Sequence, residues 1–202
     1  TNPAPTALNE KGNGISIYNA SCTIYGLCTS QMIPCNSYQP NTFQGLNYGI
    51  SISNYNSLKS VKITHNDFLN NYRGISIRNS YSSEITSNNF EIPDILTNNP
   101  LGSYGLYVES CSGYKIEGNE FQSVASQLGM YGVAFKTFTN QVANTLYHNK
   151  FTGLSIGVLT ANTFPPPVTS KQTPLSINGL QIKCNKFEAI TNKNIAITSG
   201  QL

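Results

Sequence analysis

Ile85-Thr86-Ser87-Asn88-Asn89-Phe90 is the stretch whose pattern decides the fold of this chain. It consists of an aliphatic residue, two variable residues, an asparagine, any residue and a phenylalanine. Because similar stretches recur every 22 to 36 residues, the sequence indicates a repeat protein in which the uneven spacing places extra residues in turns. Complete copies occupy residues 63–68, 85–90, 116–121, 146–151 and 182–187, and a weaker copy ends in Asn41-Thr42-Phe43.

A second repeated element consists of a glycine followed by alternating apolar and small residues. Alternation with a period of two predicts short strands with one face on a core. Copies occupy residues 14–17, 49–52, 74–77, 105–108, 132–135 and 153–156, and residues 194–197 repeat the element without the glycine. The positions predicted to face outward are Ser16, Ser51, Ser76, Tyr107, Ala134, Ser155 and Ala196.

Together the two elements predict an all-β parallel β-helix, a single-stranded solenoid of about six to seven coils with loop insertions. Stacked coils let each short strand hydrogen-bond to its counterparts above and below, ~4.8 Å away. We expect each repeat asparagine to turn a corner in the left-handed α region and to bond the asparagine of the next coil. We expect the phenylalanines to stack in the core. The predicted ladder residues are Asn41, Asn66, Asn88, Asn119, Asn149, Asn185, Phe43, Phe68, Phe90, Phe121, Phe151 and Phe187.

These repeats resemble the right-handed parallel β-helix proteins of the pectate-lyase-like superfamily, with their inward asparagine ladder, over roughly residues 12–200. The Asn-, Ser- and Tyr-rich composition is most similar to large secreted or surface proteins of Bacteroidetes, which often use type IX secretion. The resemblance implies a right-handed solenoid and an extracellular location, secreted or on the cell surface. It implies no single activity, because the superfamily includes lyases, hydrolases, phage tailspikes and adhesins.

Composition narrows the classes of function. Charged residues make up 10% of the 202 residues and the net charge is +3, with no basic run, so a nucleic-acid partner is not expected. No stretch reaches the ~20 apolar residues of a membrane span. Neutral residues, among them 26 asparagines, must supply the polar surface. We expect residues 1–11 to form a linker or N-terminal edge and residues 12–202 to form the β-helix domain, as a fragment of a longer protein.

Five cysteines leave at least one thiol unpaired. Cys22, Cys28 and Cys35 lie within fourteen residues, so one local disulfide is expected in an oxidising compartment. The alternative, a zinc site, lacks a CxxC spacing and a nearby histidine. No metal and no cofactor is therefore predicted.

Catalytic candidates are few. The only aspartates are Asp67 and Asp94, and Glu91 lies three residues before Asp94. Glycoside hydrolysis needs two carboxyl groups ~5–9.5 Å apart, one of them with a raised pKa, which a solvated loop does not provide. A Cys–His nucleophile is the other alternative, because His148 and Cys184 occupy the same repeat position in successive coils. His65 shares this position, and surface repeat residues are the preferred interpretation, so no catalytic residue is assigned.

Candidates for ligand binding lie on exposed faces and in insertions. Tyrosines can stack on sugar rings, and the candidates are Tyr55, Tyr81, Tyr107 and Tyr147. Insertions occupy residues 18–40, 91–103 and 159–174. The last contains Pro165-Pro166-Pro167, for which a rigid surface loop is preferred over a recognition site. Lys62, Glu84 and Lys115 are predicted to alternate in sign on successive coils as a structural ladder.

Two classes of function remain. The preferred hypothesis is a non-catalytic extracellular β-helix module, such as a structural spacer, an adhesin or a surface or secreted cargo segment. The alternative is a carbohydrate-active β-helix, a polysaccharide lyase or glycoside hydrolase with catalytic residues partly outside this chain. The expected partners are a polysaccharide, other surface or secretion proteins, or further domains of the same chain.

Overall fold

The computed structural model describes residues 11–30, 32–55, 58–93, 102–123, 130–138, 142–161 and 179–198. Every regular element in these ranges is a β-strand, so the all-β prediction is confirmed. None of the described residues forms a helix with the length and apolar character that a membrane crossing requires. The predicted linker lies almost entirely outside the described residues, as do Asp94 and the triple proline.

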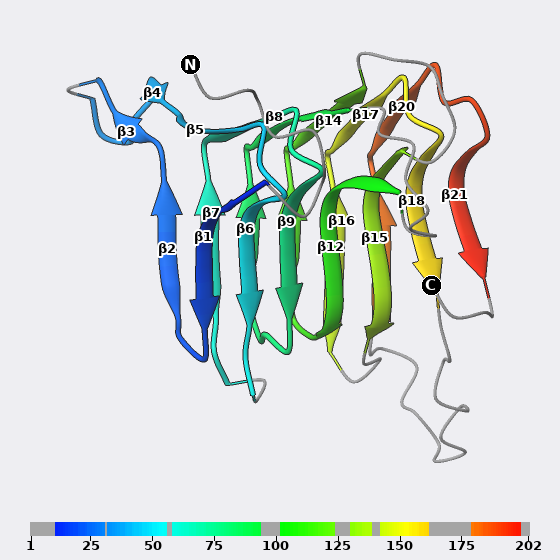
Figure 1. The fold of residues 1–202 in the computed structure, drawn as a ribbon, viewed down its shortest axis with the longest axis horizontal. Coiled ribbons are helices and arrows are strands. Elements are labelled where there is room, and N and C mark those ends of the chain that lie inside the picture. Colours follow the sequence, from blue (N-terminus) through cyan, green and yellow to red (C-terminus); the bar gives the residue numbers. More distant parts are fainter. Residues whose placement is uncertain are drawn as a thin grey trace.

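Three parallel sheets form the body of the protein, and the chain visits them in a fixed cycle (Figure 1). Sheet 1 consists of β1 (Asn13–Tyr18), β6 (Tyr48–Ser53), β9 (Arg73–Arg78), β12 (Ser103–Cys111), β15 (Met130–Phe138), β18 (Ile156–Ala161) and β21 (Lys193–Thr198). Sheet 2 consists of β2 (Cys22–Tyr25), β7 (Val61–Thr64), β10 (Glu84–Thr86), β13 (Lys115–Glu117), β16 (Ala143–Tyr147) and β19 (Gly179–Lys183). Sheet 3 consists of β5 (Asn41–Gln44), β8 (Asn66–Leu69), β11 (Asn89–Ile92), β14 (Glu120–Ser123), β17 (Lys150–Thr152) and β20 (Lys186–Glu188).

One passage of the chain through sheets 1, 2 and 3 is called a coil here. Equivalent residues of successive coils pair directly, for example Ile50 with Ile75, Ile63 with Ile85 and Phe68 with Phe90. The core lies between the three sheets and contains almost fully buried isoleucine, leucine, valine and phenylalanine side chains. Burial of like residues at each level keeps the register fixed, because a slip by one residue would turn every apolar side chain outward.

The repeat phenylalanines form a continuous stack in this core. Neighbouring ring centroids are 4.6–5.0 Å apart, with interplanar angles of 6–9°. The repeat glycines of sheet 1 make room for these rings. A Cβ atom on Gly74 would lie 2.8 Å from Cδ1 of Phe90 and 2.4 Å from the carbonyl oxygen of Gly105, so no larger residue fits without displacement.

The repeat asparagines form a second continuous stack, at the corner between sheets 2 and 3, which we call the asparagine corner. Nδ2 of each asparagine donates to Oδ1 of the asparagine one coil later, over 2.8–3.1 Å. Nδ2 of Asn119 also donates to the carbonyl oxygen of Ile85 at 2.8 Å, and the backbone N–H of Asn119 donates to Oδ1 of Asn149 at 3.0 Å. The four central amides, of Asn66, Asn88, Asn119 and Asn149, are thereby satisfied although they are almost fully buried.

The prediction that the asparagine itself adopts the left-handed conformation is wrong. The residue before it does, with φ of 54–64°, while the asparagine begins or directly precedes a strand of sheet 3. Extended backbone at the asparagine lets its side chain point inward, and the sharp bend is made one residue earlier, where the side chain points outward. The residues with positive φ are His65, Ser87, Gly118, His148 and Cys184.

The predicted strand at residues 153–156 is also misplaced. Gly153 is a turn residue with φ of 68°, and the strand of that coil is β18, in which Val158 pairs with Val133 and with Ile195. Gly157 therefore takes the place of the repeat glycine, because a Cβ there would lie 2.6 Å from Cε1 of Phe187. Leu159, rather than Ser155, is the residue of this coil on the outer face of sheet 1.

The insertion between β2 and β5 contains a short antiparallel pair, β3 (Leu27–Cys28) and β4 (Tyr38–Gln39). A disulfide joins Cys28 to Cys35, in line with the predicted local bridge. The pair projects from the end of the sheets that carries the first coil (Figure 1). Tyr38 of β4 stacks on the ring of His65, with centroids 3.6 Å apart, which fastens the insertion to the second coil.

Candidate functional site

The four tyrosines predicted to bind ligand have different surroundings. Tyr107 is only 2% exposed, and its hydroxyl donates to Oε2 of Glu109 at 3.2 Å, so the prediction that this tyrosine is exposed is wrong. The outer face of sheet 1 buries it against other residues, which a local alternation pattern does not reveal. Tyr147 is partly buried and stacks on His148, with ring centroids 4.4 Å apart. Tyr55 and Tyr81 remain exposed, at 72% and 44%.

Tyr55 and Tyr81 lie at the corner between sheets 1 and 2, where a third tyrosine joins them. Tyr18, at the end of β1, is 62% exposed, and its ring meets that of Tyr55 edge-on with centroids 4.9 Å apart. A hydrogen bond to Tyr55 raises the pKa of Tyr18. The backbone N–H of Tyr81 donates to the carbonyl oxygen of Lys59 at 2.9 Å, which joins the third coil to the second. We call Tyr18, Tyr55 and Tyr81 the tyrosine corner.

A row of hydrogen-bonded buried polar side chains lies on the inner side of the tyrosine corner. Oδ1 of Asn54 accepts from the backbone N–H of Ala20 at 3.1 Å, and Nδ2 of Asn54 donates to Oγ of Ser80 at 2.9 Å. The backbone N–H of Ser80 in turn contacts Sγ of Cys111 at 3.4 Å. Burial raises the pKa of the Cys111 thiol to about 11, so this thiol stays protonated at neutral pH. Asparagine, serine and cysteine thus occupy equivalent places in successive coils.

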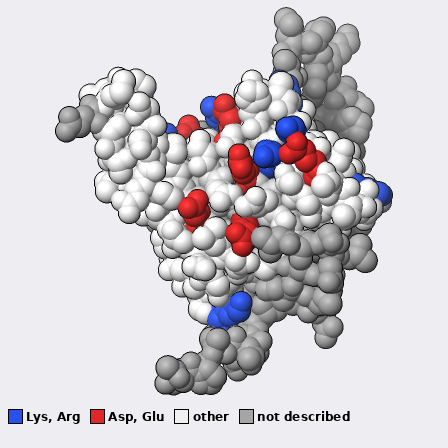
Figure 2. Space-filling model, turned by 90° about the horizontal axis from the view of Figure 1, so that it is seen from above, with Lys and Arg blue, Asp and Glu red and all other residues white. Residues whose placement is uncertain are grey.

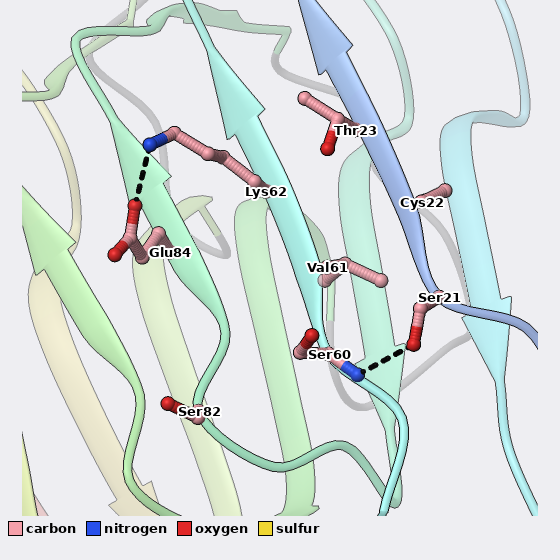
Figure 3. Close-up of a pocket in the computed structure, with 8 residues that line it drawn as sticks. All are labelled: Ser21, Cys22, Thr23, Ser60, Val61, Lys62, Ser82 and Glu84. Carbon is pink, nitrogen blue, oxygen red and sulfur yellow. Dashed lines mark hydrogen bonds and ion pairs between the residues drawn. The ribbon is translucent and has the colours of Figure 1, made fainter.

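A shallow hollow of about 520 Å³ adjoins the tyrosine corner on sheet 2 (Figure 3). Ser21, Ser60 and Ser82 lie along one end of it, where three neighbouring strands of the sheet begin. Oγ of Ser21 accepts a hydrogen bond from the backbone N–H of Ser60 at 3.1 Å. Ser82 directly follows Tyr81, so the hollow and the tyrosine corner are continuous in the chain. The remaining lining residues are Cys22, Thr23, Val61, Lys62 and Glu84.

The charges in this hollow neutralise each other. Nζ of Lys62 lies 2.9 Å from Oε2 of Glu84, and both residues face outward on neighbouring strands (Figure 3). The predicted ladder is therefore formed at its first step. The alternation of sign continues at Lys115, which pairs with Glu84 in register. Lys115 forms its ion pair with Glu117 of its own strand, at 2.6 Å, and this contact raises the pKa of Lys115.

A second hollow, of about 310 Å³, lies at the asparagine corner beside the β3–β4 insertion. Tyr38, His65, Asp67 and Glu120 are among its lining residues. Asp67 belongs to strand β8, and burial raises its pKa while a hydrogen bond from Asn89 opposes the rise. Burial lowers the pKa of His65, which favours the neutral imidazole.

Asp67 and Glu120 are aligned on the outer face of sheet 3. Asn89 pairs with Asp67 on one side and with Glu120 on the other, so two strand spacings separate the acids, ~9.6 Å between Cα atoms. Acidic side chains gather near the middle of the face seen from above (Figure 2). Glu91, on the same sheet, accepts from Nδ2 of Asn70 at 2.6 Å, and its predicted partner Asp94 lies outside the described residues.

The register places His148 and Cys184 at matching positions of neighbouring coils, and among the described residues no hydrogen bond joins their side chains. His148 stacks on its sequence neighbour Tyr147, and the exposed thiol of Cys184 belongs to the next coil. Within the described ranges, no three His, Cys, Asp or Glu side chains are grouped as metal ligands.

Two features escaped sequence reasoning. The first is Tyr18, whose partner Tyr55 lies one coil away. The second is the Asp67–Glu120 pair, whose members are 53 residues apart in sequence. Alignment of the repeats could have predicted this pair, because Asp67 and Glu120 each directly precede a repeat phenylalanine. Comparison of the chain with protein-family models, with curated proteins and with solved structures finds no match.

Proposed function

We propose that this chain is a right-handed parallel β-helix of the pectate-lyase-like kind that serves as a non-catalytic extracellular module, either a spacer or an adhesin segment. One observation carries the proposal: asparagine and phenylalanine side chains stack in unbroken register through six successive coils. Each coil rests on its neighbours through backbone, amide and ring contacts at once. Such a stack resists bending and keeps a constant shape, which is what a spacer requires.

Two further observations support the extracellular part of the proposal. The disulfide between Cys28 and Cys35 is a bond that persists in oxidising compartments. The surface polarity comes mainly from amides and hydroxyls, since only 10% of residues are charged. Partners of such a module are polysaccharides, other surface or secretion proteins, or neighbouring domains.

The proposal is tested by incubating the purified chain with a panel of neutral and uronic-acid polysaccharides. We expect no new reducing ends and no unsaturated products after prolonged incubation. Release of either product, above the level of a heat-denatured sample, overturns the non-catalytic assignment. Export is tested separately, by measuring whether the Cys28–Cys35 bond is present in protein recovered from outside the producing cell.

A second candidate function, a carbohydrate-active enzyme, is favoured by the second hollow. Inverting glycosidases place two carboxyl groups ~6.5–9.5 Å apart. The Cα atoms of Asp67 and Glu120 are separated by two strand spacings, ~9.6 Å, so their carboxyl groups fall within this range when the two side chains lean toward each other. Asp67, with its raised pKa, is the candidate acid and Glu120 the candidate base. If this function holds, Asp67→Asn and Glu120→Gln each abolish turnover, whereas Glu91→Gln on the same sheet leaves it unchanged.

A further inference from the structure

We infer that the tyrosine corner and the adjoining hollow form a binding site for a neutral polysaccharide, whose chain runs along the stacking axis over the first three coils. This inference rests on the proposed extracellular module and gives it a ligand class. The site lies on sheet 2 and its corner with sheet 1, away from the acids of sheet 3. Binding there therefore requires no catalysis.

The aromatic part of the site is presented to solvent. Tyr18, Tyr55 and Tyr81 come from three successive coils, and each keeps between 44% and 72% of its surface exposed. Other tyrosines of the chain, such as Tyr72, Tyr104 and Tyr114, are almost fully buried. Large aromatic side chains left in water on one corner mark an interaction surface. A ring with an apolar face and a polar hydroxyl suits a sugar, which offers C–H groups on one face and hydroxyls at its edge.

The polar part of the site is made of small hydroxyl groups. Ser21, Thr23 and Ser82 line the hollow (Figure 3), and Ser82 directly follows Tyr81 in the chain. Hydroxyls both donate and accept hydrogen bonds, so they can match the hydroxyls of a sugar in either sense. Lys62 and Glu84, on the next strands of the same sheet, add one strong donor and one strong acceptor.

The cations in and beside the hollow are already paired with carboxylates, which favours a neutral ligand. Lys62 and Glu84 form an ion pair inside the hollow, and Arg78, just before the tyrosine corner in the third coil, is bonded to Glu109 at 2.9 Å. A polyanion would have to compete with these carboxylates for the cations. A neutral glycan needs no such exchange, and it can accept from Lys62 and donate to Glu84 while the pair stays intact.

The spacing of the coils favours an extended polymer over a single sugar. Equivalent positions of successive coils are ~4.8 Å apart, which is similar to the advance of one pyranose unit in an extended glycan. Tyrosines on three coils therefore meet consecutive or alternate units of one chain. Because each contact is weak alone, affinity should rise with oligosaccharide length until three coils are spanned.

The experiment uses the full chain. Isothermal titration calorimetry is performed with cellohexaose, mannohexaose, laminarihexaose and, as the acidic probe, hexagalacturonate. We expect at least one neutral hexasaccharide to bind, with little change between low and high NaCl, because the contacts are not ionic. Tyr55→Ala and Tyr81→Ala should each weaken this binding by about tenfold. Tyr25→Ala, which removes an exposed tyrosine at the far end of strand β2, outside the hollow and the tyrosine corner, is the matched control and should bind like the parent.

A second pair of variants keeps the test independent of the aromatic residues. Thr23 and Thr145 occupy the same outward row of sheet 2, in the first and fifth coils. Thr23→Ala should weaken binding about threefold and Thr145→Ala should not change it. Circular dichroism and the urea midpoint confirm that each variant is folded.

Three outcomes overturn the inference: no neutral hexasaccharide binds, only hexagalacturonate binds, or the control variants lose binding as much as the tyrosine-corner variants. None of these outcomes bears on the non-catalytic assignment, which fails only if the chain cleaves a polysaccharide. Conversely, cleavage that depends on Asp67 and Glu120 would contradict the non-catalytic assignment but not the neutral-glycan site, which would then be a substrate subsite.

Discussion

The asparagine corner and the tyrosine corner each connect one sheet to the next in successive coils, but they are built from different residues. At the asparagine corner one residue type recurs, and its amide bonds the amides above and below. At the tyrosine corner the equivalent inward place holds Asn54, then Ser80, then Cys111. The outward residues there are exposed tyrosines instead of a regular row.

This difference shows where the molecule is constrained and where it is free to vary. A buried amide that bonds two identical amides cannot be replaced at one level without leaving polar atoms unsatisfied at two others. A place that already accepts three residue types tolerates change. Variable surface features are therefore expected beside the tyrosine corner. The exposed tyrosines and the hollow lined by serine and threonine hydroxyls both lie there.

The largest effect is expected from Asn119→Ser at the asparagine corner. Serine is too short to replace the amide, so Nδ2 and the backbone N–H of Asn88 lose their acceptor. Oδ1 of Asn149 loses one of its two donors, because only the backbone N–H of residue 119 remains. We expect the free energy of unfolding to fall by about 3–4 kcal/mol, measured by urea denaturation at pH 7. Asn41→Ser, at the exposed first step of the ladder, should cost less than about 1 kcal/mol. Equal costs at the two positions would contradict the ladder.

The next effect is expected from Gly105→Ala, which tests the contact between glycine and phenylalanine. The new Cβ would lie 2.6 Å from Cδ1 of Phe121, so the ring or the strand must move, at a cost of about 2–3 kcal/mol. The double variant Gly105→Ala/Phe121→Leu should be more stable than the sum of the single effects predicts. Gly12→Ala is the control, because no atom lies within 4 Å of its Cβ position.

A smaller effect is expected from Asn54→Ser, the same substitution made at the tyrosine corner. Serine already stands at the equivalent place in the next coil, so its hydroxyl can accept from Ala20 or donate to Ser80. We expect a loss of about 1 kcal/mol in the urea experiment. A loss as large as that of Asn119→Ser would remove the distinction between the two corners.

The smallest effect concerns Asp67 and depends on pH. Burial raises the pKa of Asp67 above 3.8, so the folded state binds this proton more tightly than the unfolded state does. The resulting stabilisation is complete below the unfolded pKa and is lost as the pH rises through the folded pKa. Asp67→Asn should therefore be slightly more stable than the parent at pH 7, and the difference should disappear in acid, as measured by urea denaturation across the pH range.

Glu188→Gln is the control of opposite sign for that measurement. A bond to Lys186 lowers the pKa of Glu188, so its contribution to stability is present above the unfolded pKa and is lost as the pH falls through the folded pKa. The Gln variant should be less stable than the parent at pH 7 and equal to it in acid. A shift of both variants in the same direction would show that the pH effect is not specific to these groups.

The repeat allowed much of the fold to be predicted, because Asn88 and Phe90 recur with neighbours that fix the register coil by coil. Local pattern failed where the segment that matches it is not the strand. Residues 153–156 show the alternation of apolar and small residues, whereas Gly157 is followed by valine, leucine and threonine, and only the packing of Phe187 against Gly157 identifies the repeat glycine. Burial of Tyr107 was not predictable, since alternation tells which face a residue takes but not whether that face is covered. The two hollows escaped prediction because they combine residues from several coils.

The asparagine ladder has a direction. In the hydrogen bonds between the asparagines, Nδ2 of each residue from Asn41 to Asn149 donates toward the coil that follows, and Oδ1 of each residue from Asn66 to Asn185 accepts from the coil that precedes. Their dipoles therefore add along the axis of the stack, as peptide dipoles do along an α-helix. A stack built in this way is electrically polar along its length, with the positive pole on the side of the later coils. Its two faces are consequently unlike, and reversing a single amide would set two neighbouring dipoles in opposition.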